Sequence, residues 1–380
     1  MFLRSKNFKI VLVSILIALA LGEGFLQFAL PSENEYRMWL PNMQFTFEPD
    51  STVIGGIHGA SQFSINSEGL RSNEFNPSAK LKILAIGGST TIDLLLDQNE
   101  MWTTLLQHNL RKTEDHTWIG NAGKNGLNSF HHIDQMKVLL QQFPQCNTVL
   151  ILMGVNDLQL QLVRGKYTAG DSLERYKKIF PVAPRKYFPW YQQSGYWRLA
   201  GMLKRKWIPN PPKEMVLDKD GRVLIKHRNF RAACKQKIDS LPQWTTALNG
   251  YKKNINTLID IAAQKQVRLI FATQPVLWKT NNSIAQQQLM WSGGIGDFQK
   301  NGGQYYSTKT LNESMQLFNR TLSETAVGRG IQVIDLYSQL PQDESIFYDD
   351  CHFTELGARK VAEIFAREIS SELKTAKHNK

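Results

Sequence analysis

A serine follows directly after a short apolar run and two glycines. The run covers residues 82–86, and the chain continues Gly87-Gly88-Ser89. Glycines permit the tight turn that ends a buried strand, and ligands of α/β sheets bind beyond the carboxyl ends of the strands. A hydroxyl at that edge becomes a nucleophile when a base removes its proton. The same three residues also suit a plain turn, so Ser89 needs partners elsewhere in the sequence.

A candidate base lies near the other end of the chain. His352 follows Asp349 by three residues, so the two side chains share a face if the segment forms a turn of helix. A histidine held by a carboxylate is the usual base for a serine nucleophile. Asp350 is expected to point elsewhere. Thr354 has the position of an N-cap for a terminal helix with an apolar stripe.

Two further strand ends carry hydrogen-bond donors. The run 117–121 leads into a glycine-rich turn that ends at Gly126, and the run 148–153 leads into Gly154-Val155-Asn156. Acyl transfer needs donors aimed at the oxygen that becomes negative. The backbone N–H groups of Ser89 and Gly126 and the side-chain amide of Asn156 supply three. The sequence therefore predicts an oxyanion hole at the same sheet edge as the serine.

Five apolar runs alternate with helical patterns, which predicts an α/β fold with a parallel sheet covered on both faces. Two later runs join the three above, at 268–273 and 332–336. The predicted helices cover residues 102–111, 133–143, 251–264 and 315–326. A polar, turn-rich segment at 32–80 precedes the sheet, with an alternating stretch at 62–65 that favours one hairpin.

A large insertion separates the third and fourth runs, at about residues 160–245. Residues 160–230 hold 16 Lys and Arg against 5 Asp and Glu, a net charge of +11 within a chain whose net charge is +12. Seven aromatic residues at positions 187–207 and six prolines at positions 181–212 accompany the charge. Three explanations stay open: a lid that holds an acidic or acylated polysaccharide, a surface that lies on anionic lipid, or a solvated cap without a ligand.

The N-terminus carries an apolar run at residues 10–30, long enough as a helix of about 31 Å to cross a membrane. The flanking charges are basic before it and acidic after it: Arg4, Lys6 and Lys9, then Glu33 and Glu35. This asymmetry predicts a single-pass anchor at 1–31 with a cytoplasmic N-terminus and an extracytoplasmic, periplasmic or surface-exposed, catalytic domain. Cleavage of a signal peptide after Ala20 is the alternative. Glu23 is an unusual residue within such a span.

Composition excludes several classes of protein. Of the 380 residues 42% are hydrophobic, which excludes a disordered or fibrous chain. Three scattered cysteines exclude a disulfide framework and a CxxC zinc site. No metal or organic cofactor is expected. A nucleic-acid partner is not expected outside the cytoplasm.

Taken together, these motifs resemble the four signature blocks of the SGNH/GDSL hydrolases, in the same order. The blocks are Gly87-Gly88-Ser89, residues 121–126, residues 154–157, and Asp349-x-x-His352 followed by Thr354 and Gly357. The resemblance implies a three-layer α/β/α sandwich, of flavodoxin-like strand order 2-1-3-4-5, in a domain at 81–375. It also implies that Ser89 is the nucleophile, His352 the base and Asp349 its partner, with Gly126 and Asn156 in the oxyanion hole. Gly88 departs from the family pattern, because the GDSL form has aspartate there.

These residues predict a membrane-anchored serine esterase that removes O-acyl groups, O-acetyl in particular, from a cell-envelope or exported polysaccharide. An O-acyltransferase, a lysophospholipase or thioesterase, and a non-catalytic carbohydrate-binding assembly protein are the alternatives. Cys351 is a weaker candidate nucleophile beside His352. The pair His131-His132, with His108 and His116, lacks a metal-binding spacing and is expected at a solvated helix start. Oligomeric state is open.

Overall fold

A computed structural model describes residues 6–30, 37–112, 114, 116–181, 189–207, 221–299 and 303–378. The chain forms two compact units. One comprises residues 1–36 with 182–212, and the other comprises residues 37–181 with 213–380. The second unit contains every candidate catalytic residue.

The second unit is built on a five-stranded parallel sheet of order β4-β3-β5-β6-β7. The strands are β3 (Leu81–Gly87), β4 (Thr117–Asn121), β5 (Thr148–Leu152), β6 (Arg268–Ala272) and β7 (Gln332–Ile334). Numbered within the sheet, this is the expected order 2-1-3-4-5, and all five predicted runs are strands. Strand β3 lies between β4 and β5. The residues that follow these three strands therefore meet at one edge.

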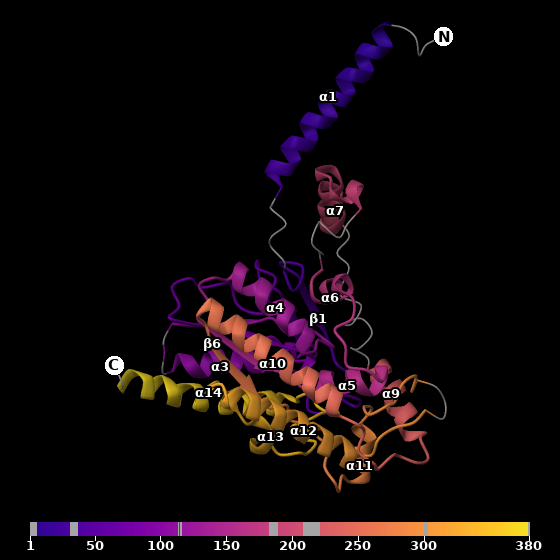
Figure 1. Cartoon of the computed structure of the whole chain (residues 1–380), viewed down its shortest axis with the longest axis vertical. Coiled ribbons are helices and arrows are strands. Elements are labelled where there is room, and N and C mark those ends of the chain that lie inside the picture. Colours follow the sequence, from indigo (N-terminus) through magenta and orange to yellow (C-terminus); the bar gives the residue numbers. More distant parts are fainter. Residues whose placement is uncertain are drawn as a thin grey trace. The chain divides into compact units, whose positions relative to one another are not determined.

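Helices cover both faces of the sheet, which confirms the three-layer α/β/α architecture. On one face α4 (Ser129–Gln142), α10 (Thr245–Lys265) and α12 (Thr308–Val327) pack side by side (Figure 1). On the other face α3 (Trp102–Arg111) packs against α14 (Glu355–His378), which α13 (Leu336–Gln339) also contacts. All four helices expected from the sequence are present: α3 has the predicted bounds, and α4, α10 and α12 begin four to seven residues before their predicted starts.

Short elements complete the second unit. Strands β1 (Gln44–Phe47) and β2 (Ser61–Ser64) pair antiparallel, as the alternating stretch at 62–65 predicts. The remaining helices are α2 (Ser89–Ile92), α5 (Val155–Arg164), α6 (Ser172–Ile179), α9 (Arg222–Ala232) and α11 (Ile284–Leu289). Thr354 caps α14 as expected, because its hydroxyl accepts the N–H of Gly357 at 3.0 Å.

The first unit contains α1 (Lys6–Ala29), the short 3₁₀ helix η3 (Trp190–Gln193) and α7 (Gly195–Trp207). Within the described residues, α1 is the one helix long and apolar enough to cross a membrane, with a mean hydropathy of 2.2 over residues 7–29. The predicted flanking charges Arg4, Glu33 and Glu35 lie outside the described residues, as do the proline-rich stretches 182–188 and 208–220 of the insertion.

Candidate active site

Ser89 is the first residue of α2, directly after the buried strand β3. The two preceding glycines are required by close contacts. A Cβ at Gly87 would lie 2.0 Å from Thr91 Oγ1, and a Cβ at Gly88 would lie 2.4 Å from Asn156 Nδ2. Glycine therefore replaces the family's aspartate at position 88 in a place where this chain leaves no room for a side chain.

A buried arginine holds the far end of the serine turn. The Arg71 guanidinium donates to the carbonyl oxygens of Ile92 and Asp93, at 2.7 Å each, and to that of Leu96 at 2.6 Å. These carbonyls belong to the last residue of α2 and to residues that follow it. Asp93, directly after α2, has a left-handed backbone with φ 49°. Burial raises the pKa of Asp93 to about 8, opposed by hydrogen bonding to Trp102 and by the charges of Arg71 and His352. Arg71 thus fixes a strained turn that carries Ser89.

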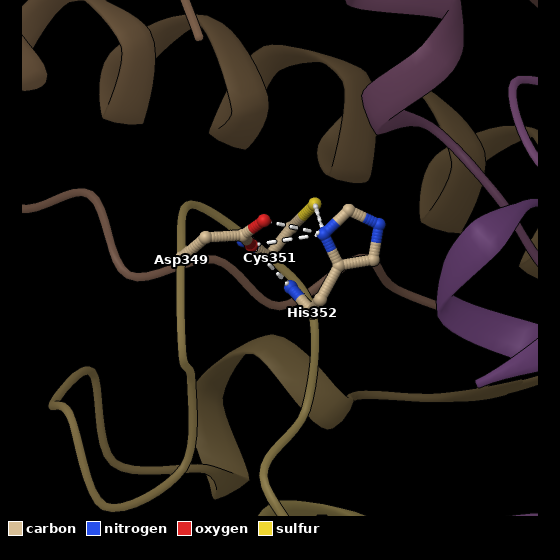
Figure 2. A group of neighbouring side chains, drawn as sticks. All are labelled: Asp349, Cys351 and His352. Atoms are coloured by element: carbon tan, nitrogen blue, oxygen red, sulfur yellow. Dashed lines mark hydrogen bonds and ion pairs between the residues drawn. The ribbon is translucent and has the colours of Figure 1, made fainter. Parts of the chain in front are cut away.

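Asp349 and His352 form a close pair (Figure 2). The imidazole Nδ1 lies 2.7 Å from Asp349 Oδ2 and 2.9 Å from Oδ1. The expected turn of helix is wrong: the segment is a bend, closed because Asp349 Oδ1 accepts the backbone N–H groups of Cys351 and His352. This bend, and not a helical turn, brings the two side chains together across their three-residue spacing. Nδ1 faces the carboxylate, so Nε2 is left for another partner.

The electrostatics of the pair favour an imidazolium and a carboxylate. Burial opposes the charge on both groups. For His352, burial is the largest single influence, but the charge of Asp349, the nearby Tyr348 and Cys351 and the hydrogen bond to Asp349 together outweigh it and raise the pKa well above its ordinary value. His352 and several hydrogen-bond donors likewise lower the pKa of Asp349 to about 2. Two opposite charges in a largely buried site stabilise each other.

Gly126 and Asn156 line one cavity of about 520 Å³. The Asn156 amide Nδ2 donates to the carbonyl of Leu127 at 2.8 Å and lies against Gly88. Gly126 has a left-handed backbone with φ 68°, and its carbonyl accepts from Lys178 Nζ at 2.6 Å. Asn156 therefore links the turn that carries Ser89 to the loop that carries Gly126.

The contacts do not join Ser89 directly to His352. Within the described part of the chain the Ser89 hydroxyl makes no hydrogen bond. The charges of His352 and Asp93 interact, and Asp93 follows α2, so the imidazole lies near the serine turn. Catalytic hydrogen bonds are often long without substrate and tighten when it binds.

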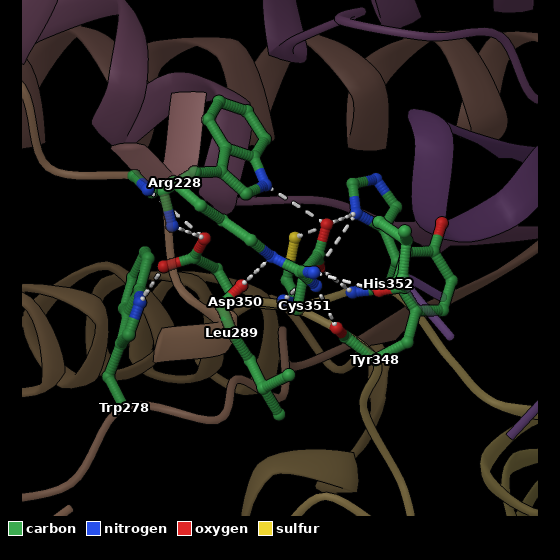
Figure 3. Close-up of polar contacts among 11 residues, drawn as sticks. Arg228, Trp278, Leu289, Tyr348, Asp350, Cys351 and His352 are labelled. Carbon is green, nitrogen blue, oxygen red and sulfur yellow. Dashed lines mark hydrogen bonds and ion pairs between the residues drawn. The ribbon is translucent and has the colours of Figure 1, made fainter. Parts of the chain in front are cut away.

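Three residues that support the Asp349–His352 segment were not found from the sequence: Trp278, Trp291 and Arg228. Figure 3 labels Trp278 and Arg228. Trp291 Nε1–H donates to Asp349 Oδ2 at 3.0 Å. Asp350 points away from the histidine, as expected, and accepts from Trp278 Nε1 at 2.6 Å and from the N–H groups of Trp291 and Ser292. Arg228 donates to the carbonyl oxygens of Val53, Leu289 and Tyr348.

Several basic residues of the insertion bind groups of the chain itself, so not all of its positive charge is available to a ligand. Arg228 and the buried Arg231 come from α9 and bind carbonyl oxygens of the chain itself. Arg175 pairs with Asp134 at 2.9 Å, and Lys178 binds Gly126. Part of the positive charge of the insertion thus stabilises the folded second unit and is not free to bind an anionic ligand.

The structure offers one candidate metal-ligating group among the described residues: Asp349, Cys351 and His352, with ligand atoms within 4.8 Å of one another. Burial raises the pKa of the Cys351 thiol, and a protonated thiol is a poor metal ligand and a poor nucleophile. His352 Nδ1 is already bonded to Asp349. The donor set therefore suits a hydrogen-bonded pair better than a metal.

The remaining histidines do not form such a group within the described residues. His131 and His132 lie at the start of α4, as expected, but the expected solvation is wrong because both are buried. His131 Nδ1 bonds to Asn128, and burial lowers the pKa of His131 to about 2 and that of His132 to about 4. Both side chains are neutral parts of the helix start. The cysteines are free and buried.

The profile of the GDSL-like lipase/acylhydrolase family matches residues 85–360. The chain belongs to this family. This GDSL-like chain is an ester-bond hydrolase, and its profile match spans all four signature blocks. Comparison with curated protein sequences finds no match.

Solved structures give distant matches to this GDSL-like protein. An acetyl xylan esterase, AlAXEase, is 11% identical with a TM-score of 0.43 over 76% of this chain and 100% of that chain. LAE5, an alpha/beta hydrolase enzyme from the metagenome of Lake Arreo, Spain, is 13% identical with a TM-score of 0.41, over 76% and 94%. Axe2, an acetylxylan esterase from Geobacillus stearothermophilus, is 13% identical with a TM-score of 0.39, over 78% and 96%. At this level of similarity, the substrates of these proteins cannot be assigned to this chain.

Proposed function

We propose that this GDSL-like hydrolase is a membrane-anchored, extracytoplasmic serine esterase that removes O-acyl groups, O-acetyl in particular, from a cell-envelope or exported polysaccharide. The observation that carries the proposal is the hydrogen-bonded Asp349–His352 pair, in which the Asp349 carboxylate is buried and the His352 imidazole is partly exposed. The candidate general base His352 is hydrogen-bonded to Asp349, the carboxylate that would orient it, as nucleophilic catalysis by serine requires.

The mechanism follows from these positions. His352 Nε2 accepts the Ser89 proton while Oγ attacks the ester carbonyl, and Asp349 stabilises the resulting imidazolium through Nδ1–H. Gly126 N–H, Ser89 N–H and the Asn156 amide donate to the oxyanion. His352 then gives its proton to the leaving sugar hydroxyl. Water attacks the acyl-enzyme through the same base, which releases the acid and restores Ser89.

A cavity next to the candidate oxyanion donors, lined by Gly126 and Asn156 but not by Ser89 or His352, favours a carbohydrate substrate over a lipid. Its lining is mostly polar or charged, with Leu160 as the largest apolar side chain. Asn128, Gln159 and Thr168 offer donors and acceptors of the kind that bind sugar hydroxyls. An acyl chain would prefer an apolar channel, which these residues do not form. A lysophospholipase role is therefore the weaker alternative.

The test is labelling of the detergent-solubilised protein with a fluorophosphonate probe, combined with nitrophenyl acetate hydrolysis and acetate release from acetylated polysaccharide. Labelling and turnover are expected in the wild type and in Ser371→Ala, a control at an exposed serine of α14, and neither is expected in Ser89→Ala.

Full activity of Ser89→Ala would overturn the nucleophile assignment. A folded wild type that neither labels nor hydrolyses would favour a binding protein. Acyl transfer to an added sugar in place of acetate release would favour the O-acyltransferase.

A further inference from the structure

The first unit contains a specific contact between α1 and the inserted helix α7, which lie beside each other in Figure 1. Glu23 Oε1 accepts the backbone N–H of Gly195 at 2.7 Å, and Oε2 accepts that of Tyr196 at 3.4 Å. These are the first two residues of α7, whose N–H groups have no partner inside the helix. A carboxylate there also offsets the positive end of the helix dipole.

Further contacts extend this N-terminal cap into an interface. Tyr196 Oη–H donates to the carbonyl of Leu19, and Gln27 Nε2 donates to that of Gln193. Two glycines allow the close approach. A Cβ on Gly22 would lie 1.9 Å from Tyr196 Oη, and a Cβ on Gly195 would lie 2.6 Å from Leu26 Cβ. The C-terminal part of α1 is therefore shaped to receive α7, a feature that a discarded signal peptide does not need.

Glu23 lies in the C-terminal third of α1, in the outer part of the span. Glu23 precedes the last residue of α1 by six positions, which is about 9 Å along the helix axis. The whole helix has 24 residues and rises about 36 Å, against a hydrocarbon thickness of about 30 Å. With the hydrocarbon layer centred on α1, about 3 Å of helix extends beyond it at each end, so Glu23 lies about 6 Å inside its outer edge. There its two bonds to the start of α7 offset the cost of placing an acid in an apolar span.

The exposed surface of η3 and α7 has the composition of a bilayer interface. Trp190 is 84% exposed, Trp197 54% and Leu203 48%. The rings of Trp190, Tyr191 and Trp197 contact one another in sequence. Arg198 and Lys204 accompany them on α7. Aromatic rings concentrate at the level of the headgroups, and basic residues there are attracted to anionic lipid.

We propose that η3 and α7 lie in the headgroup layer of an anionic bilayer, held against a retained α1 by Glu23. This inference rests on the membrane anchor in the proposed function. The partner is lipid with acidic headgroups, because the apolar surface continues that of α1 and the added charges are basic. Part of the insertion thereby becomes a membrane contact.

A disulfide test addresses the α1–α7 contact in the full-length protein in native membranes. Gln27→Cys with Gln193→Cys, at positions joined by a hydrogen bond, should form a reducible cross-link, detected by mass spectrometry of the digested protein, and Leu12→Cys with Gln193→Cys is the matched control. Adding Glu23→Leu should lower the yield about fivefold, as expected for a lost helix cap, whereas Glu23→Gln keeps an acceptor and most of the yield.

A second test measures lipid contact. An environment-sensitive fluorophore on Leu203→Cys should be quenched by lipid-attached quenchers in vesicles of phosphatidylcholine with phosphatidylglycerol, and much less in phosphatidylcholine alone. The same label on Ala263→Cys, an exposed site of α10, should not be quenched.

Three results would overturn the inference: a cross-link no stronger than the control, a mature membrane protein that begins after residue 20, or equal quenching in the two lipid mixtures. Nitrophenyl acetate hydrolysis in detergent separates these results from failure of the proposed function, since Glu23→Leu should leave that activity unchanged.

Discussion

The Asn156 side chain lies between the serine turn and the Gly126 loop. Its amide lies against Gly88 and donates to Leu127. If it also stabilises the oxyanion, Asn156→Ala should lower kcat by about 10²–10³ with little change in KM, whereas Ser89→Ala should lower it by about 10⁶. Steady-state kinetics with nitrophenyl acetate measure both. Gln159→Ala, in the same cavity, is the control, and equal losses in the two cavity variants would contradict a special role for Asn156.

The raised pKa of His352 predicts the direction of the pH dependence. General base catalysis needs the neutral imidazole, so kcat/KM should increase as pH rises through the raised pKa of His352. Asp349→Asn removes the charge that raises this pKa. The inflection should then move down toward about 6.5, the value of an unperturbed histidine, and the maximal rate should fall. A pH profile of kcat/KM measures the shift. An unmoved inflection would show that another group controls the profile, and His58→Gln, at an exposed histidine, is the control.

Trp291 is a positioning residue for the catalytic carboxylate. Its indole N–H is one of the donors to Asp349, and a hydrogen bond to a charged group contributes about 1.5–3 kcal/mol. Trp291→Phe should therefore lower kcat about tenfold and shift the pH inflection upward, because a carboxylate that has lost one hydrogen-bond donor attracts the imidazolium more strongly. Trp190→Phe serves as the exposed control. A stability loss without any shift of the pH profile would make Trp291 a packing residue only.

At the scale of elements, Arg71 joins the segment after β2 to the turn after α2. Its buried guanidinium satisfies three carbonyl oxygens that follow Ser89. Arg71→Met should leave these carbonyls unpaired and Asp93 without its nearest positive charge, which predicts a loss of about 3 kcal/mol in the free energy of unfolding. Denaturant unfolding measures it. Arg329→Met, which removes an exposed ion pair with Asp260, should cost less, and equal losses would refute the special role of Arg71.

The elements themselves could be predicted because their signals are local. Each of the five strands is a short apolar run, and α3 spans the residues expected from its periodicity. The Asp349–His352 contact was also predictable, since three residues separate the partners. Trp291, Arg228 and Arg71 were not, because they reach their targets from 21 to 175 residues away. The hydrophobic periodicity of the sequence does not indicate such contacts, because they form only when the folded sheet brings distant loops together.

At the scale of the whole molecule, the candidate catalytic residues and the candidate membrane helix belong to different compact units. The candidate residues Ser89, Gly126, Asn156, Asp349 and His352 all lie in the unit of residues 37–181 with 213–380. A domain with its own core is expected to fold and act independently.

Removing residues 1–36 should therefore leave kcat/KM for nitrophenyl acetate in detergent within about twofold of the full chain, since no candidate catalytic group is lost. The truncated protein should no longer resist extraction from membranes by alkaline carbonate, because α1 is absent. Its exposed aromatic surface at η3 and α7 should still bind vesicles that contain phosphatidylglycerol, and more weakly as salt is added. Activity lost together with residues 1–36, in a protein that remains folded by circular dichroism, would show that the first unit takes part in the catalytic site.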